Sequence, residues 1–559
     1  MTSERLAGIG RWYLRAGLFA LPLAYSWNTY DRYIVPKLLV ARLLVVGLLF
    51  LFIARAFIAQ SVVVKRTPLD WPLLAFLASA VVSTLFAENQ NVAVFGIYSR
   101  YDGLLTILTY AALFWLAVQT LEAPDDARKL LWVLLAAGYV VAAIAIVQSV
   151  TDSLQQGVFV PASGTLGQKN VLGAFLALLC PLAYGELAAA RSWGARLLAV
   201  NALTILGLAL FLSFSRSAWL GVALAAVVVG IGVRGPGLRI AIGSAAGIVL
   251  LAAAIASLAQ AGGVQPQRSD LAEFGSRPAV YRDSLKVIVS RPLLGYGPDN
   301  FGLVFPRFQT AFLGTSPVDK AHAETLQIAA SQGVVGLAAY VLLMVAFIRA
   351  FWRGRRNLGA FAVFAGWVGY TATLQVNFSA LASAFPFWIF AAAAVQTWRA
   401  TRTVQVAEWT GGGRRAAAGA AAGAVAAAAL AACVVAVLLP YLADARLLEA
   451  VNADYGGRNR DALAPAEEAM RLWPRESVYA VEVGNIAFER QDWALARDAY
   501  DDAAALGTYN PLVYRNLALA DRSLGRIAEG KEAARKAVEL NRFDPANQAL
   551  LAQFEAAQP

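Results

Sequence analysis

Long apolar segments recur along the chain, and each is separated from the next by a short polar stretch. A helix needs about 20 apolar residues to cross a bilayer, and segments of this kind lie at 12–28, 37–58, 70–87, 103–120, 129–149, 170–189, 197–214, 217–233, 239–260, 325–350, 357–377 and 382–398. A further segment at 416–440 is rich in alanine and glycine. The pattern predicts an all-α, polytopic transmembrane bundle of about 12–13 spans.

From residue 441 the pattern changes to charged segments with the apolar period of a helix. Three of them end near prolines that recur at a similar spacing: Pro474, Pro511 and Pro545. Small residues occur where paired helices would touch: Ala499, Ala505, Ala533 and Ala537. A helical-hairpin period of about 34 residues is typical of tetratricopeptide repeats. The tail is therefore predicted to be a small helical-repeat domain, either a docking platform or a domain without a partner.

The composition supports a membrane protein. Hydrophobic residues make up 59% of the chain and charged residues 15%, and the mean hydropathy is +0.57, whereas soluble domains average about 25% charged residues. The two cysteines, Cys180 and Cys433, lie far apart in apolar segments, which favours neither a disulfide nor a metal site. The N-terminal segment lacks a small-residue cleavage site and is interpreted as the first span.

Basic residues predict the orientation, because cytoplasmic loops carry an excess of Lys and Arg. With the N-terminus in the cytoplasm, the basic loops near 65, 128, 191–196, 234–239, 353–356 and 399–415 all face inward. We therefore expect a membrane domain over 1–400 with a long outward loop at 261–324, a cytoplasmic linker and last span over 401–440, and an extracytoplasmic repeat domain over 441–559.

Several cations fall in the loops that this topology places outside: Arg100, Lys169, Arg216, Arg268, Arg277, Arg282, Lys286, Arg291, Arg307 and Lys320. Ionisable residues at membrane depth are functional candidates by default, although a single one can also extend to the headgroups. One guanidinium group can bind two phosphate oxygens at once. The cluster therefore suggests an anionic ligand such as a pyrophosphate on a lipid carrier.

The densest part of this outward region is 279–289. A helix there would place Tyr281, Leu285, Ile288 and Val289 on an apolar stripe and Arg282 beside Lys286 on a polar face. Such a helix is expected to lie on the outer membrane surface with its cations at the level of the headgroups.

The motifs of several other enzyme classes are missing from the chain. It has no glycine-rich phosphate loop followed by Lys-Ser/Thr, no Gly-x-Ser-x-Gly elbow, and a single histidine, His322, which cannot build a typical zinc site. His322 begins the stretch HAETLQIAASQGVVG, at an outward membrane edge.

Four stretches, in this order, resemble the O-antigen ligase and polymerase superfamily. They are GTLGQKNVLGAFLAL, SFSRSAWLG, SRPAVYRDSLKVIVSRPLLGYGPDNF and HAETLQIAASQGVVGL, and FGIYSRYDGLLT resembles a segment of members with C-terminal tetratricopeptide repeats. His322, Gly333 and Gly336 match the family pattern, whereas Ala323 stands where Asn, Ser or Gln is usual. Arg216 matches the arginine of the Ser-Arg motif, and Arg277 the arginine of the outward loop, with Tyr281 in place of the usual Trp.

The resemblance implies a metal-independent glycosyltransferase of the GT-C type that uses no cofactor. It would transfer a glycan from undecaprenyl pyrophosphate to an acceptor at the outer face of a bacterial plasma membrane. His322 would be the general base, and Arg216 and Arg277 would stabilise the leaving pyrophosphate. Further pyrophosphate-binding candidates are Arg282, Lys169, Arg100, Arg291 and Lys286. Gly333 and Gly336 are expected to let neighbouring helices approach closely.

Three other functions remain open from the residues alone. A polymerase would join one lipid-linked repeat unit to another, whereas a ligase would use a lipid, protein or other glycan acceptor. A transporter or flippase would need charges near the bilayer midplane or a two-fold repeat, and the sequence suggests neither. A scaffold that works through its tail would leave the outward arginines unexplained. No pattern predicts a nucleic-acid partner.

Overall fold

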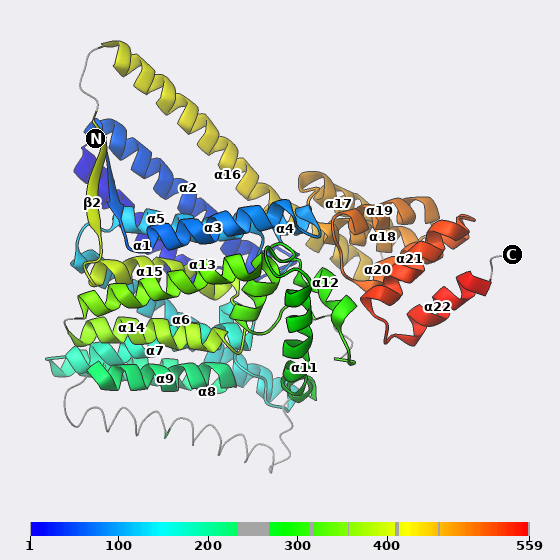
Figure 1. Cartoon of the computed structure of the whole chain (residues 1–559), viewed down its shortest axis with the longest axis horizontal. Coiled ribbons are helices and arrows are strands. Elements are labelled where there is room, and N and C mark those ends of the chain that lie inside the picture. The colour runs from blue at the N-terminus through cyan, green and yellow to red at the C-terminus, as the bar shows by residue number, and fades with distance from the viewer. Residues whose placement is uncertain are drawn as a thin grey trace.

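The computed structural model describes residues 2–232, 247, 268–313, 318–355, 357–408, 413–456 and 459–556. In these ranges the chain is almost entirely helical (Figure 1), as the apolar periodicity predicts. The predicted span at 239–260 lies outside the described residues, apart from Gly247, as do parts of the predicted outward loop.

A bundle of helices forms the membrane domain, and its members coincide with the predicted spans other than 239–260 and 416–440; the latter lies within the long helix described below. Among the described helices, five are long and apolar enough to cross a membrane: α2 (Ile34–Ala59), α6 (Pro124–Gln156), α7 (Lys169–Ala189), α8 (Trp193–Leu212) and α13 (Glu324–Gly354). Five shorter apolar helices pack among them: α3 (Asp70–Leu85), α5 (Leu104–Thr120), α9 (Arg216–Gly232), α14 (Leu358–Leu374) and α15 (Leu381–Thr397). α1 (Ser3–Leu23) begins earlier than its predicted span at 12–28.

One end of the bundle gathers segments that the sequence predicts on a common side. Two short strands that the sequence did not predict, β1 (Ser61–Arg66) and β2 (Arg402–Glu408), pair there in an antiparallel sheet. The start of α1 joins the same end, because Arg11 forms an ion pair with Glu122 at 2.5 Å and Arg15 with Asp126 at 2.9 Å. The N-terminus and the loops near 65, 122 and 402 therefore lie together, at the left of Figure 1.

The opposite end carries the short helix α4 (Gln90–Phe95), α11 (Arg268–Ser290) and α12 (Phe301–Phe308). α11 runs across the direction of the bundle (Figure 1). Two members of its predicted apolar stripe, Leu285 and Val289, are 52% and 75% exposed, whereas Ile288 of the same stripe packs against the protein core. A second apolar face, not predicted, holds α11 on the protein: Val280 and Val287 are buried in a small core.

α13 is broken at Gly333, whose backbone has φ 66° and ψ −166°. The loop that follows α11 enters the break: the Val334 amide donates to the Pro292 carbonyl at 2.7 Å, and the Gly297 amide donates to the Ser331 carbonyl at 2.8 Å. A Cβ on Gly333 would collide with the Leu293 carbonyl. Only glycine combines this positive φ with such a close backbone approach.

The expected role of the two glycines in helix–helix packing is therefore corrected. Gly333 accommodates a loop in a broken helix, and Gly336 faces the Gln332 side chain of the preceding half of α13. Both pack against chain segments that the break brings close, so the pair does not form a contact between two continuous helices.

The tail is a stack of antiparallel helices joined to the bundle by one long helix, α16 (Gly413–Tyr455), which passes through the predicted domain boundary at 440–441 (Figure 1). The others are α17 (Asn459–Leu472), α18 (Ser477–Glu489), α19 (Trp493–Ala505), α20 (Pro511–Ser523), α21 (Ile527–Leu540) and α22 (Pro545–Ala556). Pro511 and Pro545 begin helices, a position that suits proline. Ala499, Ala533 and Ala537 are buried as expected, but Ala505 is exposed and Ala503 is buried in its place.

Candidate functional site

The segment 319–324, which ends at the first residue of α13, carries four charged or titratable side chains, and three of them bind other parts of the chain. Asp319 contacts the loop after α4, Lys320 contacts that loop and the loop after α11, and Glu324 contacts the loop after α14. His322 stands between them with a left-handed backbone, φ 52°. This short segment thus holds together loops that are distant from one another in the sequence.

The His322 side chain is mostly buried. Its ring packs edge-on against Phe378, with ring centroids 5.4 Å apart, and its backbone carbonyl accepts a hydrogen bond from the Tyr281 hydroxyl at 3.1 Å. Its Nδ1 atom is buried and has no hydrogen-bond partner among the described residues. Burial lowers the pKa of His322 to about 4; the nearby Arg277 and Arg100 also lower it, and Asp319 opposes them. The imidazole is therefore neutral at neutral pH and can accept a proton.

Arg277 lies close enough to His322 to lower its pKa. One of its terminal nitrogens donates to the Val376 carbonyl at 2.6 Å, which ties α11 to the loop that also carries Phe378. A guanidinium is charged at every relevant pH and has five N–H donors, a set that suits phosphate oxygens. The predicted pairing of His322 with Arg277 is thus matched by their proximity, while their catalytic roles stay predictions.

Arg100, from the loop after α4, contacts the same Phe378 ring as His322. Its Nε donates to Asp319 Oδ2 at 2.5 Å, and its guanidinium lies over the Phe378 ring, 5.1 Å from the centroid. Burial disfavours the charge, but the Asp319 carboxylate raises the pKa of Arg100 above its ordinary value. Phe378 therefore contacts both Arg100 and His322, which places the two groups against one aromatic side chain.

A buried ion cluster behind His322 was not predicted from the sequence. Lys320 is 2% exposed and donates to Asp102 at 2.7 Å and Asp299 at 2.8 Å. Asp299 also accepts from the backbone amides of Ile97 at 2.8 Å and Asp102 at 3.2 Å. Burial disfavours the charge of Lys320, but the two carboxylates raise its pKa above the ordinary value. Burial raises the pKa of Asp102 to about 6, although Lys320 lowers it. This cluster holds the FGIYSRYDG loop against the histidine segment.

Arg216 and Lys169 lie at the same end of the bundle as His322. α9 runs antiparallel to α14, since Gly221 lies against Thr373 and Gly232 against Phe361, so Arg216 at the start of α9 lies near the loop that follows α14. The Ser215 hydroxyl donates to the Asn170 side chain at 3.1 Å, which places the start of α7, with Lys169, beside the start of α9. The structure thus brings the Ser-Arg and Gln-Lys-Asn motifs together.

The other three predicted cations are engaged elsewhere on the surface. Arg282 and Lys286 both contact the buried Asp283, at 3.4 and 2.9 Å, and are themselves 59% and 44% exposed. Arg291 forms an ion pair with Glu88 at 3.4 Å and lies over the Tyr296 ring. None of these contacts involves His322 or Phe378, so the pyrophosphate binding predicted for these three cations has less support than that of Arg277 and Arg100.

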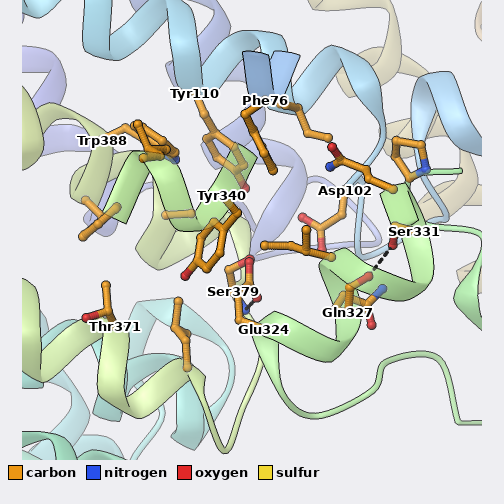
Figure 2. A pocket seen from close by; sticks show the side chains of 18 of the residues that line it. Phe76, Asp102, Tyr110, Glu324, Gln327, Ser331, Tyr340, Thr371, Ser379 and Trp388 are labelled. Carbon is orange, nitrogen blue, oxygen red and sulfur yellow. Dashed lines mark hydrogen bonds between the residues drawn. The ribbon is translucent and has the colours of Figure 1, made fainter. Parts of the chain in front are cut away.

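A cavity of about 130 Å³ extends from this loop into the bundle. Asp102, Lys320 and Glu324 are among the residues that line it, and Figure 2 shows the aromatic side chains of Tyr110, Tyr340 and Trp388 around it. The Ser379 backbone amide and hydroxyl both donate to the Glu324 carboxylate, at 2.9 and 3.0 Å. A larger cavity of about 580 Å³ lies at the opposite end, beside Arg128, Glu186 and Arg399, and contains none of the predicted site residues.

In the described part of the chain, no group of three His, Cys, Asp or Glu side chains is arranged to hold a metal ion. The carboxylates near His322 are instead paired with Lys320, Arg100 and Ser379. The alternation of charged residues in DKAHAE, 319–324, was the available sequence signal for these pairs, but their partners lie too far away in sequence to be identified from it.

Comparison with known proteins gives a family match for the central segment. Residues 201–341 match the family model described as O-antigen ligase, and the matched segment contains Arg216, Arg277 and His322. No curated protein matches the chain. The first TPR domain of the human RPAP3 protein is similar to 21% of this chain over 93% of its own length, at 19% identity and a TM-score of 0.20. The Arabidopsis OM64 TPR domain is similar to 22% over 99% of its own, at 16% identity and a TM-score of 0.21. The central segment of the chain thus resembles the O-antigen ligase family, and this match supports a multi-pass membrane protein of the ligase or polymerase type.

Proposed function

We propose that the protein transfers a glycan from a polyprenyl-pyrophosphate carrier to an acceptor hydroxyl at the outer face of a bacterial plasma membrane, as an O-antigen ligase. The observation that carries this proposal is the environment of His322: a mostly buried imidazole that is neutral at neutral pH, beside two arginines. A neutral imidazole accepts a proton, and arginines stabilise a leaving phosphate.

The reaction needs two groups on opposite sides of the anomeric carbon. His322 takes the proton of the acceptor hydroxyl as its oxygen attacks that carbon, and the bond to the pyrophosphate oxygen breaks. Arg277 and Arg100 hold the departing pyrophosphate, with Arg216 and Lys169 as further cations at the same end of the bundle. The negative charge of a bound donor offsets the two arginines and raises the pKa of His322, so the base is stronger in the complex than in the free protein. No metal or cofactor takes part in this proposal.

The alternative is a polymerase, whose acceptor is a second lipid-linked repeat unit. The same base and arginines serve both reactions, so the acceptor alone separates them. Ala323 follows His322 where the family usually has a polar residue, and this departure keeps the polymerase open. In either reaction the His322 end of the bundle faces outward, and the basic end that carries the β1–β2 sheet faces the cytoplasm.

The decisive experiment measures transfer by the purified full chain from a synthetic polyprenyl-pyrophosphate oligosaccharide. We expect His322→Ala to lower kcat by about 10²–10⁴-fold, the usual contribution of a general base, while the donor still binds. Arg277→Ala should instead weaken donor binding, because it removes a charge that contacts the pyrophosphate.

Arg291→Ala is the matched control, since Arg291 is an outward arginine that contacts Glu88 and takes no part in the proposed step. Full turnover by His322→Ala would disprove the general-base role. The mass of the product formed with each acceptor then distinguishes a ligase from a polymerase.

A further inference from the structure

The C-terminal repeat domain is fastened to the membrane domain at the end that carries His322. The side chain of Asn89 donates to the Ala505 carbonyl at 3.2 Å, and that of Asn91 donates to the Leu506 carbonyl at 3.2 Å. Arg307 bridges the domains, because it contacts Glu88 and Glu539, both at 2.7 Å. These contacts lie on both sides of the loop between α19 and α20, so that loop has a defined position against the bundle.

Tyr509 in this loop lies at the site. A Cβ placed on Gly302 would be 3.3 Å from Asp319 Cα and 3.7 Å from Tyr509 Cδ1, so Asp319 and the Tyr509 ring meet at the same glycine. Burial raises the pKa of Tyr509, and the Asp319 carboxylate raises it further, while Arg100 lowers it. Tyr509 therefore lies beside the Arg100–Asp319 pair and helps to shield it from water.

We infer that the repeat domain is part of the transfer site itself and that Tyr509 is a positioning residue, which holds Arg100 for the anionic end of the donor. The inference rests on the proposed function for the identity of the donor. Arg100 has three supports: its ion pair with Asp319, the Phe378 ring, and the adjacent Tyr509, which is contributed by a separate domain. A charge-assisted hydrogen bond is stronger in such a partly buried, low-dielectric environment than in water.

The test uses the purified full chain and two probes: inorganic pyrophosphate, measured by calorimetry, and the polyprenyl-pyrophosphate oligosaccharide, measured by transfer. We expect Tyr509→Ala to weaken pyrophosphate binding and to raise KM for the donor by about tenfold, the effect of weakening one charge-assisted hydrogen bond. Tyr509→Phe keeps the ring and should stay near wild type. Tyr455→Ala is the matched control, because Tyr455 is an exposed tyrosine at the start of the same domain.

A double-mutant cycle separates positioning from a general loss of stability. If Tyr509 acts through Arg100, the double variant Arg100→Ala/Tyr509→Ala binds pyrophosphate no more weakly than Arg100→Ala alone. Additive losses, or wild-type binding by Tyr509→Ala, would overturn the inference. If Tyr509→Ala fails to fold, Tyr509→Leu replaces it, because leucine fills much of the same space without the ring. The same loss of pyrophosphate binding is then expected.

The outcomes for the two proposals are distinct. A wild-type chain that binds pyrophosphate but transfers no glycan contradicts the proposed function, and leaves standing only the part of the inference in which Tyr509 positions Arg100 for an anion. Transfer by the wild type with an unaffected Tyr509→Ala contradicts the inference alone. A wild-type chain that binds no pyrophosphate contradicts the assignment of Arg100 as an anion-binding group, and the inference with it.

Discussion

Replacing Lys320 by methionine removes the cation between two buried carboxylates. Lys320 is 2% exposed, and its ion pairs with Asp102 and Asp299 measure 2.7 and 2.8 Å. Breaking a buried pair by removing one partner costs about 3–5 kcal/mol, which is more than a hundredfold in the equilibrium for opening this region. We expect a lower thermal unfolding temperature, and faster hydrogen exchange at the Ile97 and Asp102 amides that Asp299 holds.

The loss of stability in Lys320→Met is expected to depend on pH. Burial already raises the pKa of Asp102, and loss of Lys320 raises it further, so the folded variant binds protons that the unfolded chain releases. Such a group stabilises the fold as pH falls through its folded pKa, and the variant should therefore be less impaired at acidic than at neutral pH. Asp102→Asn added to the variant should restore part of the loss.

The control is Lys536→Met, which removes a partly exposed lysine that contacts Glu539 at 3.0 Å. Surface pairs contribute about 0–1 kcal/mol, so its unfolding temperature should hardly change. If Lys320→Met unfolds and exchanges like the wild type near pH 7.5, the buried cluster does not hold the loop and the reasoning is refuted.

Three further predictions follow from single sites. Because burial lowers the pKa of His322 to about 4, kcat/KM should stay flat from about pH 5 to 7.5; an acid limb near pH 6.5 would contradict the buried environment. Gly333→Ala should reduce the yield of folded protein, since it adds a backbone clash to the strain of a positive φ, about 1–2 kcal/mol; Gly157→Ala has the same φ of 66° in open space and should fold well, and equal yields would argue against the clash. Arg282→Gln and Lys286→Gln should each change kcat/KM by less than about threefold, because both side chains are largely exposed and contact Asp283, outside the proposed step; a loss as large as that of Arg277→Ala would place them in the site.

The hydrophobic pattern predicted the helices well because bilayer thickness sets a minimum length for each apolar segment. The proximity of His322 and Arg277 was also accessible, since both belong to recognisable stretches of one outward region. The partners of Lys320 were not, because Asp102 and Asp299 are contributed by separate loops, and pairing over such sequence distances depends on the assembled bundle. The break at Gly333 was not predicted for a related reason: the loop that enters it is not a neighbour in the sequence.

The tail could be predicted as a helical repeat but not as a neighbour of the site. The proline spacing predicts the helical hairpins within the tail. The contacts of Asn89, Arg307 and Tyr509 depend instead on the orientation that α16 gives the tail relative to the bundle. The face of α11 that carries Val280 and Val287 was missed because periodicity alone cannot tell which of two apolar faces packs on protein.

The small sheet at the other end of the bundle imposes an order on biosynthesis. β1 leaves the ribosome long before β2, its only sheet partner in the described chain. At a synthesis rate of about 5–20 residues per second, β1 exists for roughly 15–70 seconds before β2 has been made. During this time the strand edge that pairs with β2 is open. An open edge can recruit a wrong strand, and Lys65 and Arg66 place two positive charges on it, which discourages such pairing. The sheet therefore closes late, after the helices between its strands have been made.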